Sequence, residues 1–306
     1  MEDPAIATRL NNQVREVRWE RMYRHELEAA LATNPVVYFS HGLCEPHGPH
    51  AVLGLDTLKA HKLCVLAAHT FGGIVAPPES WHVQEQNGYA AWMAYTCGEV
   101  RSWCTAVPYQ HHFKSVAYQV RAAHQNGFEA AIFLTGHYGP NWMDLKHVLE
   151  WLQPYVAPRL YGVPDFEACT VRWDGSNADH AGKVETSQLW ALEPDMVDMR
   201  RLPADPANRF ACGDTAAEAH YAKGCEMVQS QVEWLGNKAE ELRAAYAALR
   251  LLGPRPEVTF ATIDAVWDAK IEPALPDFAC AKPCFADYFG APPLSSRWYP
   301  HWKGAL

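Results

Sequence analysis

Carboxylate and imidazole side chains are concentrated in the segment from Cys44 to Asp56, which reads CEPHGPHAVLGLD. Glu45, His47, His50 and Asp56 lie within these thirteen residues. If the chain stays extended after the preceding apolar run, Glu45 and His47 point the same way, because side chains alternate along a strand. Carboxylate oxygens and imidazole nitrogens bind divalent transition-metal ions. The segment therefore predicts a metal site, in which we expect His50 to be a buried residue outside the ligand set.

Two later segments carry the same kinds of side chain in turns that glycine permits. The segment TGHYGPN, from Thr135 to Asn141, places His137 beside a glycine directly after an apolar run. The segment DHAGKVETS, from Asp179 to Ser187, has a glycine at its turn, and its glutamate falls at the expected start of a helix. Each turn would let a ligand project from the edge of a sheet.

Short apolar runs alternate with helical patterns along the chain, and these elements must position the three segments. Such alternation favours an α/β domain with a largely parallel sheet, in which sites form at the carboxyl edge of the strands. Asp56 stands where a helix N-cap is expected. Residues 35–39, 128–134 and 169–173 predict buried strands, and 74–76 is a further short apolar run. The expected helices are residues 14–32, 56–71, 116–125, 141–152, 184–192 and 215–252.

The composition of the chain argues against several classes of partner. The chain has 306 residues, of which 49% are hydrophobic and 20% charged, enough to bury a substantial core. A formal charge of −9 argues against nucleic acid as a partner. No apolar run approaches the roughly 20 residues that span a bilayer, so we expect no membrane partner. The charged N-terminus does not resemble a signal peptide, and nine scattered cysteines fit a reduced, cytoplasmic protein.

Two stretches depart from the alternation of strands and helices. Residues 80–112 are rich in tryptophan and tyrosine with little periodicity, and we expect a long loop system over the site. Residues 253–306 are rich in proline and aromatic residues and too apolar for a disordered tail. We therefore expect a main domain over residues 1–252 and a C-terminal extension over 253–306. The extension should pack on the body, on a neighbouring subunit or over the mouth of the site.

Taken together, the three segments resemble the creatininase (creatinine amidohydrolase) family. Its pattern is E-x-H-G-P-H followed by D, then N-G-H-x-x-N, then H-A-G-x-x-E-T-S. Here the first motif starts at Glu45, the second has Thr135 in place of the usual Asn, and the third is intact from His180 to Ser187. The resemblance covers roughly residues 36–199. Three motifs in the right order are a much more specific signal than any one of them.

The resemblance implies a three-layer α/β/α sandwich with a mostly parallel central sheet, here followed by an irregular C-terminal extension. It also implies two divalent ions, zinc or manganese, and a homo-oligomer, often a hexamer. In creatininase a glutamate two residues after the motif histidine binds the second ion, but here that position is Gly139, which leaves Glu185 as the natural ligand. The implied ligands are Glu45, Asp56 and His137 for the first ion, and His47, Glu185 and the bridging Asp56 for the second.

The resemblance also implies which residues act on the substrate. His180 matches the catalytic histidine of the family, which moves a proton, and Glu185 would serve catalysis as well as metal binding. Tyr138 occupies the position of a site tyrosine. We also expect substrate contacts from Trp81, His111 and Asn141.

The substrate cannot be carried over from the family, because the stretch AVPYQHHFKS lacks the usual Pro-Gly-Thr turn. The leading hypothesis is a hydrolase in which a metal-activated water opens a small polar ring or cleaves a small amide. A second hypothesis is hydrolysis of a C–C bond in a cyclic 1,3-dicarbonyl of the diketo-inositol type. A third is a metal-binding paralogue without catalysis. In each enzymatic reading, the partner is a small molecule.

Overall fold

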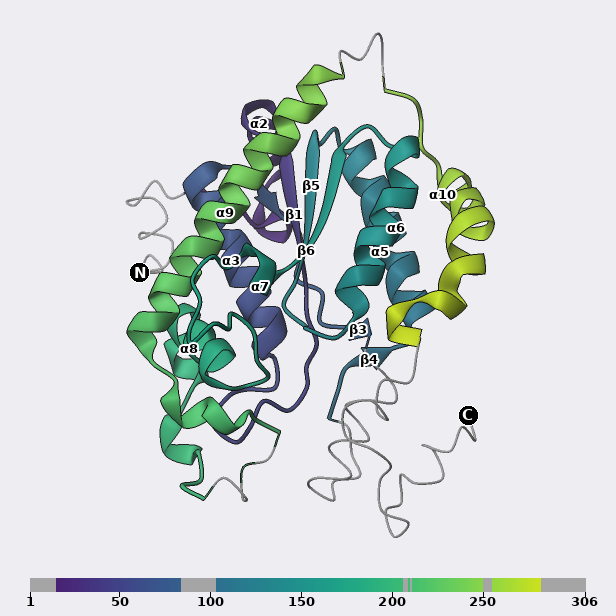
Figure 1. Cartoon of the computed structure of the whole chain (residues 1–306). Helices are drawn as coiled ribbons and strands as arrows, with labels where there is room; N and C mark the ends of the chain where they lie inside the picture. Colours follow the sequence, from purple (N-terminus) through teal and green to yellow (C-terminus); the bar gives the residue numbers. More distant parts are fainter. Residues whose placement is uncertain (1–14, 84–102, 206–208, 210, 250–254, 282–306) are drawn as a thin grey trace, which may run out of the picture.

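The computed structural model describes residues 15–83, 103–205, 209, 211–249 and 255–281. Within these residues, four parallel strands form the main sheet, in the order β2-β1-β5-β6. Helices lie on both faces of this sheet, which gives a three-layer α/β/α sandwich (Figure 1). The strands are β1 (Val36–His41), β2 (Ile74–Val75), β5 (Ala130–Thr135) and β6 (Arg159–Pro164).

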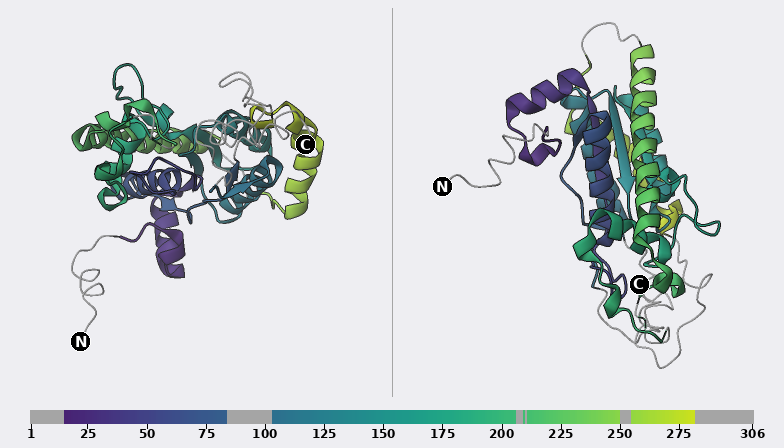
Figure 2. Two further views of the ribbon diagram at one scale, coloured as in Figure 1. Left: turned by 90° about the horizontal axis from the view of Figure 1, so that it is seen from below. Right: turned by 90° about the vertical axis from the view of Figure 1, so that its left-hand side faces the viewer.

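The alternation of side chains along β1 divides the core into two halves. Val36 and Tyr38 pack with α3 and α9, whereas Val37 and Phe39 pack with α5 and α6. Both faces of the strand are buried, as expected for a central parallel strand. Figure 2 shows the two helical layers on opposite sides of the sheet. The helices are α3 (Leu55–Phe71), α5 (Tyr109–Gln125), α6 (Asn141–Leu152) and α9 (Tyr221–Ala248).

The register of the sheet aligns the ends of its two central strands. His41, the last residue of β1, pairs with Thr135, the last residue of β5. The loops that follow therefore leave the sheet at the same edge. The third candidate segment reaches this edge through α8 (Lys183–Leu192), which packs against α9 and α3. Gly224 of α9 permits that packing, because a Cβ there would collide with the backbone of Ser187.

Several elements differ from those predicted from the sequence. Residues 169–173 form no strand, and the sheet instead uses β6, whose sequence RLYGVP holds a glycine and a proline that weaken the strand pattern. Gly162 allows close packing there, because a Cβ would lie 3.0 Å from the end of the Leu149 side chain in α6. Among the described residues the first α-helix is α2 (Arg24–Thr33), after a 3-10 turn at Trp19–Arg21. Helix α5 begins earlier than expected, at Tyr109.

Asp56 is not the N-cap of α3, as the sequence had suggested. The N-cap is Gly54, and Asp56 is the second residue of the helix, where it is buried. The Asp56 side chain is therefore buried in the interior and does not cap the helix.

Residues 255–281 return to the body of the molecule. They form α10 (Phe260–Val266) and short π and 3-10 pieces, and Ile263, Trp267 and Phe278 join the core against α5 and α6. The carboxylate of Asp144 in α6 accepts hydrogen bonds from the backbone of Ala279 (2.8 Å) and of the next residue (2.9 Å). The described part of the extension thus packs on its own chain.

Parts of the two unusual stretches lie outside the described residues. From the aromatic stretch, β3 (His82–Val83) pairs in parallel with β4 (Ala106–Val107), and the residues between 83 and 103 are not among those described. The same holds for residues 282–306 of the extension. Among the described helices, none is both long and apolar enough to span a membrane.

Candidate metal centre

Five buried side chains from the three motifs meet at the carboxyl edge of the sheet. Glu45 and His47 come from the loop after β1, Asp56 from the first turn of α3, His137 from the loop after β5 and Glu185 from the first turn of α8. Gly42 and Gly136 allow both loops to press against the start of α3, because a Cβ on either would collide with the backbone of Asp56.

The first group of ligand-type atoms consists of Glu45, Asp56 and His137. His137 Nδ1 lies 3.0 Å from Glu45 Oε1 and 3.2 Å from Asp56 Oδ2. The other oxygen of Glu45, Oε2, is buried without a hydrogen-bond partner in the described part of the chain. A buried carboxylate oxygen with no donor is costly unless a cation completes its surroundings.

The second group consists of His47, Asp56 and Glu185. His47 Nε2 lies 3.2 Å from Asp56 Oδ1 and 3.8 Å from Glu185 Oε2. The other ring nitrogen, Nδ1, is held 3.0 Å from the carbonyl oxygen of Glu45. Asp56 thus turns Oδ2 towards one group and Oδ1 towards the other, the arrangement of a bridging carboxylate. Both groups coincide with the ligand sets that the family resemblance implied.

The protonation of the cluster without metal supports its fit to cations. Burial disfavours the charged form of His47, but the carboxylates of Asp56, Glu185 and Glu45 outweigh that effect and raise its pKa to about 9. Burial also opposes the ionisation of Asp56, yet His47 and His137 hold its pKa well below the usual range. The cluster therefore attracts positive charge. Mixed carboxylate and imidazole donors suit zinc or manganese.

Lys59 is a member of this site that the sequence analysis missed. It is fully buried, and its Nζ donates hydrogen bonds to Glu185 Oε1 (2.7 Å) and Tyr138 Oη (2.8 Å). The same atom lies 3.1 Å from Asp165 Oδ2 at the end of β6. Burial, opposed by Lys59, raises the pKa of Asp165 to about 6. The available signal was a lysine three residues after Asp56, on the same face of the helix.

The turn before α8 holds His180 beside the cluster. Asp179 caps the helix, because its carboxylate accepts hydrogen bonds from the backbone of Val184 (2.8 Å) and Glu185 (3.0 Å). The His180 ring stacks on that of His47 with centroids 4.6 Å apart, and its Nε2 lies 3.1 Å from the carbonyl oxygen of Pro46. Burial lowers its pKa. His180 also forms a possible ligand group with Glu45 and His47, so its atoms lie within reach of an ion.

The remaining candidate residues differ in their surroundings. Tyr138 contacts Lys59, and Asn141 is buried at the start of α6. Trp81 and His111 are exposed, and their contacts with a substrate stay predictions. His50 is buried and hydrogen-bonds through Nε2 to the hydroxyl of Thr186 (2.9 Å), and it belongs to neither of the two groups of ligand-type atoms.

Comparisons with known proteins agree with these observations. The sequence profile of the Creatininase family, described as creatinine amidohydrolase, matches residues 20–240. A creatinine amidohydrolase of Pseudomonas putida is 24% identical over 216 residues, which cover 64% of this chain and 78% of the relative.

Solved structures support the fold. The crystal structure of a creatinine amidohydrolase (creatininase) has a TM-score of 0.60 at 20% identity, covering 74% of this chain and 98% of the other. A manganese creatininase has a TM-score of 0.60 at 21% identity, covering 74% and 99%. A Zn-Zn form of a Glu-to-Gln mutant creatininase has a TM-score of 0.60 at 21% identity. The match covers 74% of this chain and 98% of the other. The predicted α/β/α sandwich is thereby confirmed.

Proposed function

Because this chain belongs to the creatininase family, we propose that it is a metal-dependent amidohydrolase that cleaves a small amide or opens a small polar ring. The observation that carries the proposal is the placement of Asp56, whose two oxygens face two separate groups of buried ligand atoms. Such an arrangement is costly to bury unless cations occupy it.

The donor set fits two divalent ions. Glu45, Asp56 and His137 would hold one, and His47, Asp56 and Glu185 the other. Zinc and manganese are the candidates, because both occur in creatininase structures. The chemistry that such a pair supplies is a nucleophilic water at neutral pH and a polarised substrate carbonyl.

The protein's own residues position the ions and move the proton. Lys59 fixes Glu185 through a 2.7 Å hydrogen bond, and its positive charge offsets the negative charge of that carboxylate. The lowered pKa of His180 keeps its ring neutral near pH 7, so it can accept a proton and return it to the leaving group. Tyr138 stands beside Lys59, where its ring can contact a bound substrate.

Counting the ions in an Asp56→Ala variant tests the proposal. We expect the variant to lose two ions per chain relative to wild type and to lose activity, because a bridging ligand serves both ions. Asp195→Ala, at an exposed aspartate of the same charge, is the matched control and should keep every ion. An Asp56→Ala protein that retains all ions and full turnover would refute the bridging role.

A second candidate reaction is hydrolysis of a C–C bond in a cyclic 1,3-dicarbonyl. It is favoured by Gly139, which replaces the glutamate that creatininase carries two residues after the motif histidine. Turnover of a panel of cyclic amides, linear amides and diketo-cyclitols separates the two reactions. Absence of any turnover by the metal-loaded protein would favour the paralogue without catalysis.

We also propose a homo-oligomeric, cytoplasmic enzyme. The family resemblance implies an oligomer, often a hexamer, and sedimentation measures its size. A reducing compartment is supported by the sequence, in which nine cysteines are scattered without paired spacing.

A further inference from the structure

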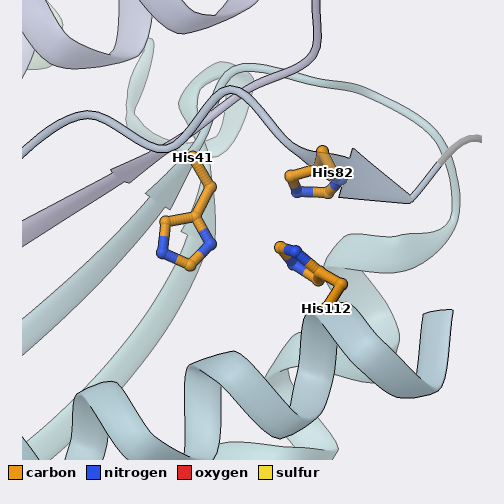
Figure 3. Close-up of side chains that lie close together, drawn as sticks. All are labelled: His41, His82 and His112. Atoms are coloured by element: carbon orange, nitrogen blue, oxygen red, sulfur yellow. The ribbon is translucent and has the colours of Figure 1, made fainter. Parts of the chain in front are cut away.

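Three histidines outside the motifs gather beside the metal centre. His41 ends β1, His82 lies in β3 and His112 lies in the first turn of α5. All three are buried, and one ring nitrogen of each lies within 4.8 Å of the others. Figure 3 shows the rings facing a common space, and the centroids of His82 and His112 are 4.0 Å apart. We name these three residues the histidine triad.

His41 presents an unpartnered nitrogen to this space. Its Nε2 lies 2.9 Å from the side-chain oxygen of Gln119, which accepts a hydrogen bond from the Nε2–H group. The lone pair of the ring is therefore on Nδ1. That Nδ1 is buried and has no hydrogen-bond partner in the described part of the chain. In Figure 3 a ring nitrogen of His41 points towards the other two histidines. A buried acceptor left in this way implies a missing partner.

His82 is oriented in the same manner. Its Nδ1 lies 3.3 Å from the carbonyl oxygen of Val83, which leaves the lone pair on Nε2. Thr135 Oγ1 lies 3.4 Å from that Nε2, but this hydroxyl donates its proton to the carbonyl of His137. The His82 lone pair therefore remains available.

The backbone of Trp81 favours protonation of the His112 ring, as a nearby carbonyl acceptor does. His41 and His82 each have one ring nitrogen beside an oxygen acceptor and one facing the common space. Metal-ligating histidines carry this second hydrogen bond as a rule, because it fixes the tautomer and the direction of the ring.

Burial favours the neutral form of the triad rings. Burial lowers the pKa of His41 to about 4, and burial with repulsion from neighbouring histidines lowers the pKa of His82 and His112 well below the usual value. Neutral imidazole is the form that binds metals. An ordinary cluster of core histidines needs no such convergence of lone pairs on one point.

We propose that His41, His82 and His112 bind a third divalent transition-metal ion, of the zinc type, next to the binuclear centre. Tetrahedral coordination with bonds of about 2.0–2.1 Å sets the nitrogens about 3.3 Å apart. The ring nitrogens of the triad lie within 4.8 Å of one another, so binding would draw them closer together. Three histidines leave a fourth position open, as in catalytic zinc sites. The His82 ring lies 5.4 Å from that of His137, so the new site adjoins the substrate region.

This inference does not rest on the proposed function, because none of the three residues belongs to the two carboxylate groups. The experiment is a titration of the metal-free protein with Co2+, followed by visible absorption and by elemental analysis of the Zn2+-loaded protein. We expect three ions per wild-type chain and two in His112→Gln. His111→Gln is the matched control, since His111 is the exposed neighbour on the same helix, and it should keep three.

An Asp56→Ala background separates the two proposals. If the triad is a metal site, this variant should keep one ion, and His112→Gln in that background should remove it. Circular dichroism checks that each variant is folded. A zinc anomalous-scattering peak between His41 and His82 in wild-type crystals gives a reading that needs no variant. Two ions in wild type and in His112→Gln alike, with no anomalous peak at the triad, would overturn the inference and leave a water-filled histidine cluster.

Discussion

Lys59 places one buried positive charge between two buried carboxylates, those of Glu185 and Asp165. The lysine is fully buried, so neither solvent nor salt screens these pairs. The arrangement holds Glu185 in position before any ion binds. It also makes the lysine hard to replace, because its removal leaves two carboxylates without their main counter-charge.

We predict that Lys59→Met destabilises the metal-free protein by about 3–5 kcal/mol, the usual cost of breaking a buried ion pair from one side. The double variant Lys59→Met/Asp165→Asn should recover part of this loss, because it also removes one stranded charge. Urea denaturation of wild type, Asp165→Asn, Lys59→Met and the double variant measures the coupling. A Lys59→Met loss below about 1 kcal/mol would show that the pairs contribute little.

We predict that His180→Ala keeps the ions of wild type and lowers turnover by about 10²–10⁴-fold, the usual contribution of a general acid–base. The reason is that both carboxylate groups are complete without His180. Metal content and kinetics on the same samples test this, with the exposed His220→Ala as the control. Loss of an ion in His180→Ala would instead identify His180 as a ligand, which its proximity to Glu45 and His47 allows.

Among the elements, the segment before the first 3-10 turn is tied to the edge of the sheet. The backbone nitrogen of Val75 in β2 donates to the carbonyl of Val17, and Glu16 binds Arg18 through a 2.8 Å ion pair. The carboxylate of Glu16 also accepts hydrogen bonds from the backbone of Val17 and Arg18 (3.0 Å each). Burial opposes its ionisation, but these bonds lower the pKa from 4.5 to about 2.

The lowered pKa of Glu16 fixes the direction in which the stability of the fold changes with pH. A carboxyl group whose pKa is lower in the folded state stabilises the fold above its unfolded pKa, and the contribution is lost as the pH falls from 4.5 towards about 2. We predict that Glu16→Gln lowers stability by about 1 kcal/mol at pH 7, a value reduced for solvent screening. The difference from wild type should shrink steadily below pH 4.5, as measured by urea denaturation. Glu20→Gln, at an exposed neighbour, is the control, and a difference that stays constant with pH would contradict the assignment.

The sequence predicted the elements that have strong periodicity and the ligands that lie in short motifs. Strands β1 and β5 and helices α3, α6 and α8 were predicted close to their observed positions. Strand β6 was missed, since Gly162 serves packing against α6 and weakens the strand pattern. The histidine triad was missed because its members meet only through the bridge of His41 with Glu79 and the pairing of β3 with β4. Such long-range pairing leaves no local signal.

At the scale of the whole molecule, residues 255–281 complete the core over α5 and α6 (Figure 1). Trp267, Ile271 and Phe278 are buried there, and each buried side chain of this size stabilises the fold by about 1.5–3 kcal/mol. Their combined contribution is comparable with the total stability of a typical domain. The segment is therefore part of the folding unit, although the family profile ends at residue 240.

We predict that a chain ending at residue 254 loses most of its stability, whereas one ending at residue 281 stays folded and binds metal as wild type does. Thermal denaturation and metal analysis of both truncations test this. Sedimentation of the longer truncation also tests whether residues 282–306 contact a neighbouring subunit, as their composition predicts. Equal stability of the two truncations would show that the packing of 255–281 is dispensable.

The separation of Lys59 and Glu185 by 126 positions has a consequence for how the enzyme is made. A ribosome delivers Glu45, Asp56 and His137 well before Glu185, so the first group of ligands can assemble while α8 is still unsynthesised. Until Glu185 emerges, Lys59 has no partner on that side. We therefore expect the two ions to be acquired in sequence during or after translation, with the second ion loaded only when the last motif has left the exit tunnel and docked.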